Sequence, residues 1–238
     1  MNFIPGWFPV GAVAARTPPS LTYVGITKSA AAAQNFSFAG VNIGPAAATR
    51  RLIVALAWEN SVAHRTISSF TMDIGGGPVS MGADLVHAIA SPGFQGGDVA
   101  FYSILAPTGG SALFQVNTSG TNVHMSMSVF NALNETVASP HAAMTDGTLS
   151  GNTLSGNINI PANGWLLAVS NGFGSPTPGS MNWTGVTPVY QDVLGTTAIR
   201  TSGATENLLP VQAGRAVAAV IPAATAGQTG SLAAMSWG

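Results

Sequence analysis

The residues that could carry out chemistry in this 238-residue chain are few and scattered, with eight acids, four histidines and no cysteine. His64, His87, His124 and His141 lie in four segments, without the i,i+2 or i,i+4 spacing that presents two metal ligands on one strand or helix. A metal site would therefore need the fold to gather these side chains. We expect neither a metal nor a cofactor, and we interpret the histidines as surface or interface residues.

Glu59 and Asp73 come closest to the carboxylate pair of a glycosidase, because each follows a segment that we expect to be a strand. A structural role suits them better, since acids at strand ends accept hydrogen bonds from backbone amides or pair with arginines such as Arg51 and Arg65. The sequence contains no G-x-S-x-G, H-E-x-x-H, P-loop or dinucleotide-binding motif. We therefore predict that the protein is not an enzyme.

Charged residues make up only 6% of the chain, against roughly a quarter in an average soluble domain, and the formal net charge is −1. The hydrophobic fraction of 46% is ordinary, so the chain should fold rather than stay disordered. A surface with so little charge lacks the self-repulsion that keeps proteins monomeric, which predicts a homo-oligomer or a subunit that binds other proteins. The one basic cluster, Arg50-Arg51, is too small for a nucleic-acid footprint, so we expect no direct nucleic-acid partner.

We expect neither export nor membrane insertion. The first 19 residues are apolar, but they lack the basic start of a signal peptide and are interrupted by Pro5 and Pro9. No segment reaches the roughly 18 uninterrupted apolar residues of a membrane helix. The absence of cysteine suits a reducing cytoplasm as the place of synthesis.

Strand patterns recur along the chain, whereas helix patterns do not. The segment Arg51-Leu-Ile-Val-Ala-Leu-Ala-Trp58 is a short apolar run typical of a central strand buried on both faces. Segment 122–130 alternates instead, with methionine and valine on one face and His124, Ser126 and Ser128 on the other, which predicts a half-buried strand whose second face is wet or lies at an interface. The other expected strands are 21–27, 35–43, 66–74, 99–105, 112–117, 157–160, 165–170, 186–193, 215–221 and 231–237.

Turn signals separate these segments, among them Asp146-Gly147, Asn163-Gly164, Asn171-Gly172 and the run 75–78. Short strands with this punctuation predict an all-β fold, an antiparallel β-sandwich of jelly-roll-like type. We expect one sandwich domain over residues 20–238, and the alternative is two small sandwiches. The Ala-rich segments 30–33 and 45–49 are too short for stable helices, so we expect loops there.

Residues 1–19 form an irregular N-terminal arm in this prediction. Phe3, Ile4, Trp7 and Phe8 are large apolar residues set among prolines and glycines, which disfavour regular structure. One interpretation is that the arm folds back over its own sandwich and covers an edge strand. The other is that these four residues bind a partner subunit, because buried aromatic side chains dominate interface energies.

Three strand segments follow one another in a recognisable order: Leu21-Thr-Tyr-Val-Gly25, Phe36-Ser-Phe-Ala-Gly-Val-Asn-Ile-Gly44 and Arg51-Leu-Ile-Val-Ala-Leu56. Two later stretches fit the same pattern: Ser103-Ile-Leu-Ala-Pro-Thr-Gly109 and Ile160-Pro-Ala-Asn-Gly-Trp-Leu-Leu-Ala168. Over residues 21–170 this order resembles a group of tailed-bacteriophage and prophage virion proteins. The resemblance consists of strand and turn patterns, does not include the N-terminal arm, and transfers no catalytic residue. It implies a β-sandwich structural component of a phage particle.

Composition and resemblance together predict a virion structural protein: a capsid decoration, head-fibre or tail-associated subunit located in the virion. Its partners would be copies of itself and other virion proteins. The alternative is a carbohydrate-binding β-sandwich that recognises a host surface glycan, with the rings of Trp183 and Tyr190 stacking on sugars. Trp183 lies in the polar segment Ser180-Met-Asn-Trp-Thr-Gly185, which is typical of a binding loop, although a core tryptophan fits there too.

Overall fold

The computed structural model of the chain describes residues 17–60, 64–87, 96–122, 124–135, 137–147, 152–173, 180–194, 199–222 and 230–238. Every regular element in these ranges is a β-strand, and every strand pairing is antiparallel. This confirms the predicted all-β, antiparallel class. The same ranges contain no helix long and apolar enough to cross a membrane.

The first nine strands form two sheets, which we name by their place in the molecule. The N-terminal inner sheet has the order β1-β9-β3-β7-β6, and the N-terminal outer sheet has the order β2-β8-β4-β5. The strands are β1 (Ser20–Lys28), β2 (Ala33–Gly44), β3 (Arg51–Asn60), β4 (Ile67–Asp73), β5 (Val79–Ser80), β6 (Gly82–His87), β7 (Gly96–Leu105), β8 (Gly110–Asn122) and β9 (Met125–Leu133).

The remaining eight strands form a second pair of sheets. The C-terminal inner sheet has the order β10-β17-β12-β15-β14, and the C-terminal outer sheet has the order β11-β16-β13. The strands are β10 (Ala142–Asp146), β11 (Thr153–Ile160), β12 (Gly164–Phe173), β13 (Asn182–Thr184), β14 (Thr187–Leu194), β15 (Ile199–Leu209), β16 (Gln212–Val220) and β17 (Gly230–Trp237).

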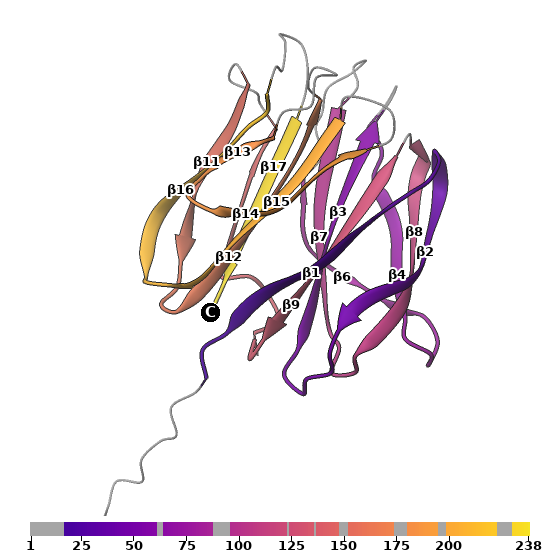
Figure 1. Cartoon of the computed structure of the whole chain (residues 1–238), viewed down its shortest axis with the longest axis horizontal. Helices are drawn as coiled ribbons and strands as arrows, with labels where there is room; N and C mark the ends of the chain where they lie inside the picture. The colour runs from indigo at the N-terminus through magenta and orange to yellow at the C-terminus, as the bar shows by residue number, and fades with distance from the viewer. Residues whose placement is uncertain are drawn as a thin grey trace, which may run out of the picture.

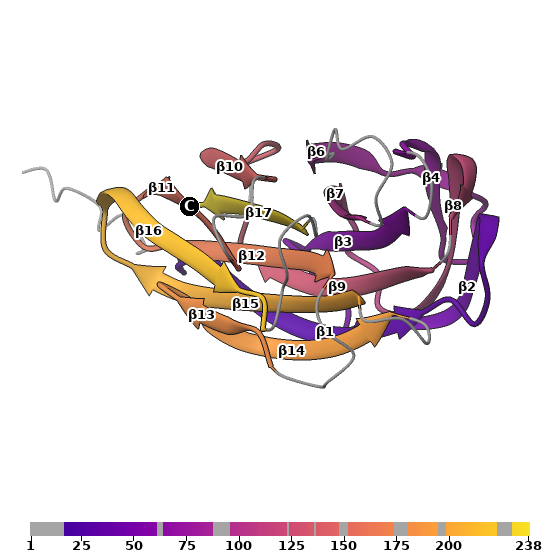
Figure 2. The ribbon, with the colours of Figure 1, turned by 90° about the horizontal axis from the view of Figure 1, so that it is seen from above.

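The four sheets are stacked as layers, with the two inner sheets facing each other. Figure 2 shows this order, with β16 at one side, β2 and β8 at the other, and β12 and β3 between them. An N-terminal core around Trp58 fills the space between the N-terminal sheets, and a C-terminal core around Leu166 fills the space between the C-terminal sheets. A central core, which includes Phe101 and Trp165, joins the two inner sheets.

The two halves of the chain share one strand order. In each inner sheet the first strand of the half lies beside the last strand of that half, β1 beside β9 and β10 beside β17. Three more strands follow in corresponding order, β3, β7 and β6 in the N-terminal half and β12, β15 and β14 in the C-terminal half. In each outer sheet the second strand lies beside the penultimate and then the fourth. The chain therefore repeats one sandwich path, and the layering matches the alternative of two small sandwiches. A single folding unit over 20–238 and a jelly-roll-like path stay predictions.

The strands run between two ends of the molecule. β1 begins at the basal end, where the Leu21 backbone and the Asn207 side chain exchange two hydrogen bonds of 2.7 and 2.9 Å. β3 and β12 also begin there and finish at the apical end, where the Asn171 amide donates to the carbonyls of Trp58 at 3.0 Å and Asp98 at 3.2 Å. Figure 1 shows the basal end at the bottom, with the C-terminal half at the left.

The prediction of a doubly buried strand at 51–58 is confirmed by β3, in which every residue from Arg51 to Glu59 is buried. Leu52, Val54, Leu56 and Trp58 point into the N-terminal core, and the residues between them point into the central core. For 122–130 the alternative of a wet face is wrong, because the whole of β9 from Met125 to Ala132 is buried, whereas the alternative of a face at an interface agrees with the structure. Its serine face is covered by the second sandwich rather than by water.

The sequence predicts a turn at Asn171-Gly172, but both residues lie inside β12. A Cβ atom at position 172 would stand 2.2 Å from Ile221 Cδ1, so a larger residue there would displace the Ile221 side chain that packs against β12. Asn163-Gly164 is a turn as predicted, with Asn163 at a φ of 58° just before β12 begins.

Candidate functional site

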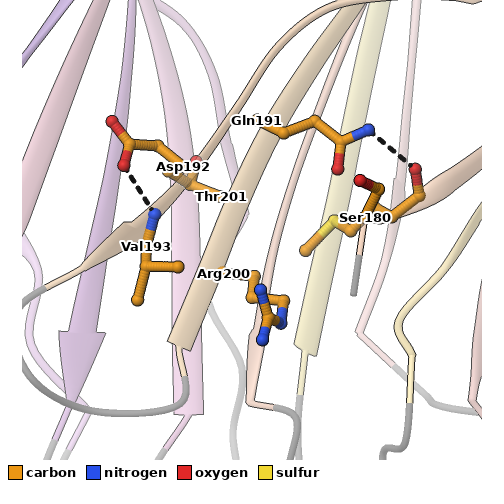
Figure 3. Close-up of a pocket in the computed structure, with 7 residues that line it drawn as sticks. Ser180, Gln191, Asp192, Val193, Arg200 and Thr201 are labelled. Carbon is orange, nitrogen blue, oxygen red and sulfur yellow. Dashed lines mark hydrogen bonds between the residues drawn. The ribbon is translucent and has the colours of Figure 1, made fainter. Parts of the chain in front are cut away.

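A pocket of about 200 Å³ lies at the apical end of the C-terminal sandwich (Figure 3). It lies beside β14, the edge strand of the C-terminal inner sheet, and beside the segment that precedes β13. Its lining is mostly polar: Ser180, Met181, Gln191, Asp192, Val193, Arg200 and Thr201.

Strand pairing places the polar groups of this pocket. Asp192 lies opposite Thr201, and Val193 lies opposite Arg200, across the β14–β15 ladder. The Gln191 side-chain amide donates a 3.1 Å hydrogen bond to the Met181 carbonyl, which attaches the segment before β13 to β14. The pocket can therefore present a guanidinium, a carboxylate, an amide and hydroxyls to a small polar ligand.

The Asp192 carboxylate is already engaged by the protein. Its Oδ1 accepts hydrogen bonds from the Val193 backbone N–H at 2.7 Å and from Lys28 Nζ at 2.6 Å. Lys28 ends β1 of the N-terminal inner sheet, so this ion pair links the two halves. Arg200, with only 7% of its surface exposed, is the buried positive charge of the pocket. No signal in the sequence indicated that Arg200 belongs to a site, because its strand is rich in small polar residues and shows no strand pattern.

The two predicted sugar-stacking residues lie near this pocket but face elsewhere. The Tyr190 ring stacks on Tyr23 with centroids 5.3 Å apart and packs against the central core. Burial raises the pKa of its phenol, with smaller effects from neighbouring Ser128, Thr201, Tyr23 and Asp192. Trp183 Nε1 donates a 2.8 Å hydrogen bond to Ser202 Oγ, and its ring packs against the C-terminal core. Sugar stacking by these rings stays a prediction, and their packing gives it no support.

Glu59 and Asp73 lie at opposite ends of the N-terminal sandwich, so they cannot form a glycosidase pair. Glu59 lies at the apical end of β3, fully buried, with its Oε2 3.3 Å from His124 Nδ1. Asp73 ends β4 at the basal end, where its Oδ1 accepts hydrogen bonds from the backbone N–H groups of Gly75 at 2.7 Å and Gly77 at 3.1 Å. The structural interpretation of Asp73 as a turn acceptor is confirmed.

The histidines are not gathered into one site. His64 Nδ1 lies 2.9 Å from Oδ2 of the buried Asp98, and His124 pairs with Glu59, whereas His141 is exposed. The His87 side chain lies outside the described residues. In the part of the chain that the structure describes, no group of three or more acids and histidines is placed to hold a metal ion.

No family model and no curated protein matches the chain. The function must therefore be inferred from the residues and their arrangement. The four arm residues predicted to bind a partner, Phe3, Ile4, Trp7 and Phe8, lie outside the described residues, and their role stays a prediction.

A buried polar cluster joins the two sandwiches at the basal end. Arg51 Nη1 donates a 3.0 Å hydrogen bond to Ser103 Oγ, and the Arg51 Cζ atom lies 5.2 Å from the centroid of the Trp237 ring. Asp84 on β6 lies beside this group. Desolvation by burial raises the pKa of Asp84 to about 6, although a hydrogen bond from Ser103 and the Arg51 charge oppose the shift.

The raised pKa of Asp84 makes stability depend on pH. The protonated Asp84 side chain contributes to the free energy of unfolding. This contribution is fully present below the unfolded pKa of about 3.9 and is lost as the pH rises through the folded pKa of about 6. We expect Asp84→Asn to be more stable than the wild type at pH 7.5 by about 1 kcal/mol, less than the full shift implies because the side chain is partly exposed. Urea unfolding at pH 4 and pH 7.5 measures this. An equal difference in the free energy of unfolding between the variant and the wild type at both pH values would contradict this prediction.

Proposed function

We propose that the protein is a structural subunit of a bacteriophage particle and acts through protein–protein assembly. The observation that carries the proposal is the burial of many charged side chains inside the fold. The chain has seven basic and eight acidic residues, and six of those that the structure describes are buried: Arg50, Arg51, Glu59, Asp98, Glu135 and Arg200. The solvent-facing surface is therefore even poorer in charge than the composition indicates, and little electrostatic repulsion opposes contact with other subunits.

Arg50 shows how completely a charge can be used inside the fold. Its guanidinium donates to the carbonyls of Ala106 at 2.7 Å and Pro45 at 2.8 Å, and also to those of Ile43, Gly44 and Thr108. These bonds fix the loop between β2 and β3 at the basal end. The arginine pair that forms the one basic cluster of the sequence is thus committed to structure rather than to a surface patch.

Exposed apolar side chains support an interface at the basal end. The large hydrophobic residues that are exposed in the described ranges all flank connections at that end: Ile74, Val79, Leu105, Val137, Leu208 and Val211. β1 also begins there, so the predicted N-terminal arm leads into the same end. An assembly contact through this end would bury them.

The turn between β15 and β16 gives the sharpest sign of such a contact. Leu208 is 60% exposed and Val211 is 72% exposed. Leu208 also has a φ of 52°, a left-handed backbone conformation that glycine or asparagine adopts more easily. An apolar residue kept in a strained and solvent-exposed position suits a role in binding another subunit.

The repeated strand order also supports the proposal. Each half places its first strand beside its last, and its first four strands alternate between the inner and the outer sheet, as in a jelly-roll-like sandwich. We propose this path for both halves. A rigid double sandwich with little surface charge suits a subunit that is built into a particle.

The proposal predicts that the purified chain self-associates. We expect sedimentation velocity at about 50 μM to show an oligomer, and raising NaCl from about 0.1 to 1 M should not dissociate it, because the contacts are uncharged. The double variant Leu208→Asp/Val211→Asp should shift the protein towards monomer. The matched control Thr121→Asp adds charge at the apical end and should leave association unchanged.

Two results would contradict the proposal. One is a wild-type chain that stays monomeric at the highest concentration. The other concerns the particle itself: an antibody against the chain should detect it in density-purified phage particles from the producing bacterium. Its absence from those particles would reject the virion role even if the chain self-associates.

A further inference from the structure

The outer face of the N-terminal outer sheet is polar, open and almost free of charge. Phe36, Phe38, Phe70 and Phe114 on β2, β4 and β8 point inward to the N-terminal core. The residues between them face solvent, as the period-two alternation of a strand requires. This face lies on the side of the molecule away from the second sandwich, at the right of Figure 1.

Strand register arranges the outward side chains in two rows across the sheet. Asn117 on β8 lies opposite Asn35 on β2 and opposite Ser69 on β4. Gln115 lies in the same way between Ser37 on β2 and Thr71 on β4. Asn117 Nδ2 donates a 2.7 Å hydrogen bond to Ser69 Oγ, which holds one amide in place before any ligand arrives.

The face is hollowed rather than flat. One hollow of about 290 Å³ lies over both rows and is bounded by Pro78. A second hollow of about 340 Å³ lies between β2 and the connection from β1 to β2. Both are lined by Asn35, Phe36 and Ser37, so they meet at β2 and form one trough, which we call the β2 groove.

We propose that the β2 groove binds a neutral oligosaccharide. Each of its amides can donate and accept hydrogen bonds, and each hydroxyl can do both through one oxygen. Sugar hydroxyl groups have the same dual capacity, so a ligand dense in hydroxyls can pair with both rows at once. The inference does not depend on the assembly role proposed above.

The charges near the β2 groove are already paired. Lys28, which lines the second hollow, donates to Asp192 at 2.6 Å. The Asp73 carboxylate at the end of β4 accepts two backbone N–H groups of its own turn. Lys28 is the one charged side chain in the described lining and its charge is matched by Asp192, so a neutral ligand is favoured over a sialic acid or a phosphorylated sugar.

A second protein surface fits this face less well. The centres of protein interfaces are enriched in aromatic residues, methionine and arginine and depleted in serine. The two aromatic residues that line the groove, Phe36 and Phe38, are 5% and 4% exposed because their rings belong to the core. The two rows are formed by asparagine, glutamine, serine and threonine, which suits a hydrated, hydroxyl-rich ligand.

Saturation-transfer NMR on the full chain tests the inference, with maltotriose, mannotriose and tri-N-acetylchitotriose as neutral probes and sialyllactose as the acidic probe. We expect at least one neutral probe to bind at concentrations up to about 20 mM. The acidic probe should not bind with higher affinity than that neutral probe. Ser37→Ala/Gln115→Ala should weaken binding at least about tenfold. The matched pair Ser155→Ala/Asn157→Ala, on the exposed face of β11, should bind as the wild type does.

Three outcomes would overturn the inference. The first is that no neutral probe binds. The second is that binding survives in the β2 groove variant while that variant keeps the wild-type melting temperature. The third is that the Ser37/Gln115 variant changes the sedimentation of the chain without a change in sugar binding, which would assign this face to a second copy. If the β2 groove variant unfolds, Ser69→Ala and Thr71→Ala replace it, since they remove hydroxyls from the same rows.

Discussion

Replacing Trp237 with alanine should lower the free energy of unfolding by about 3–5 kcal/mol, because the change leaves a large cavity in a core that cannot collapse around it. The Trp237 ring is 1% exposed and stacks on Trp165 with centroids 5.6 Å apart. It also lies under the Arg51 guanidinium. For a chain of this length the loss corresponds to a fall in melting temperature of roughly 6–20 °C, measurable by calorimetry.

The same variant tests whether the two sandwiches unfold as one unit. Trp237 belongs to the central core, which joins the inner sheets of both halves. If residues 20–238 are a single folding unit, the wild type and the variant each melt in one transition. Two transitions, of which Trp237→Ala shifts only one, would show two units instead.

Trp237→Phe is the matched control for this experiment. The indole N–H of Trp237 has no hydrogen-bond partner among the described residues. Phenylalanine keeps most of the ring contact and removes that unpaired donor, so it should cost much less than alanine. Equal losses from the two variants would contradict the packing argument.

Removing residues 1–16 should reduce incorporation into particles at least tenfold while leaving the melting temperature within a few degrees of the full-length value. Trp7 and Phe8 would each bury roughly 150–250 Å² on a partner, which at about 25 cal/mol per Å² contributes roughly 7–13 kcal/mol for the two together, before the entropy of ordering the arm is subtracted. The cut keeps Pro18, whose carbonyl accepts a 3.3 Å hydrogen bond from Asn134, and the buried Pro19.

The arm prediction is checked by measuring the shortened chain in purified particles against the double variant Trp7→Ala/Phe8→Ala. Both should be depleted to a similar degree, because the two rings carry the contact. If the shortened chain unfolds, the arm belongs to the core of its own sandwich. If particles take up the shortened chain normally, the arm does not dock.

The amino-acid sequence determined the fold class through features that act locally. The run of branched, apolar residues that becomes β3 has apolar side chains on both faces of the strand. Exposing either face to water would be unfavourable, so the run favours a central strand that is buried on both faces. Residues that tolerate a positive φ fix turns without help from the rest of the chain, as at Asn163 and in the glycines at 75 and 77. Twelve of the seventeen described strands could therefore be predicted, whereas β5, β6, β10, β13 and β15 were not.

Long-range packing decided the features that sequence patterns missed. β15 carries no strand pattern, because Arg200, Thr201, Ser202 and Gly203 are polar or small, yet it pairs with both β12 and β14, and residues 200–204 are buried. The alternation of β9 left its serine face either in water or at an interface, and the structure decides for the interface, because Ser126 and Ser128 are buried at the junction with the second sandwich. In both cases the neighbouring layer, which is distant in sequence, removes the water.

The sites depended on the tertiary structure in the same way. Nothing local relates Asn35, Ser69 and Asn117, which become one row only when β2 and β4 pair with opposite sides of β8. The small number of charged residues was visible from the sequence. The burial of many of them inside the fold was not, because it depends on tertiary contacts such as the hydrogen bonds of Arg50 to five backbone carbonyls. Composition thus determined that this surface is nearly uncharged, and strand register alone decided where its polar groups meet.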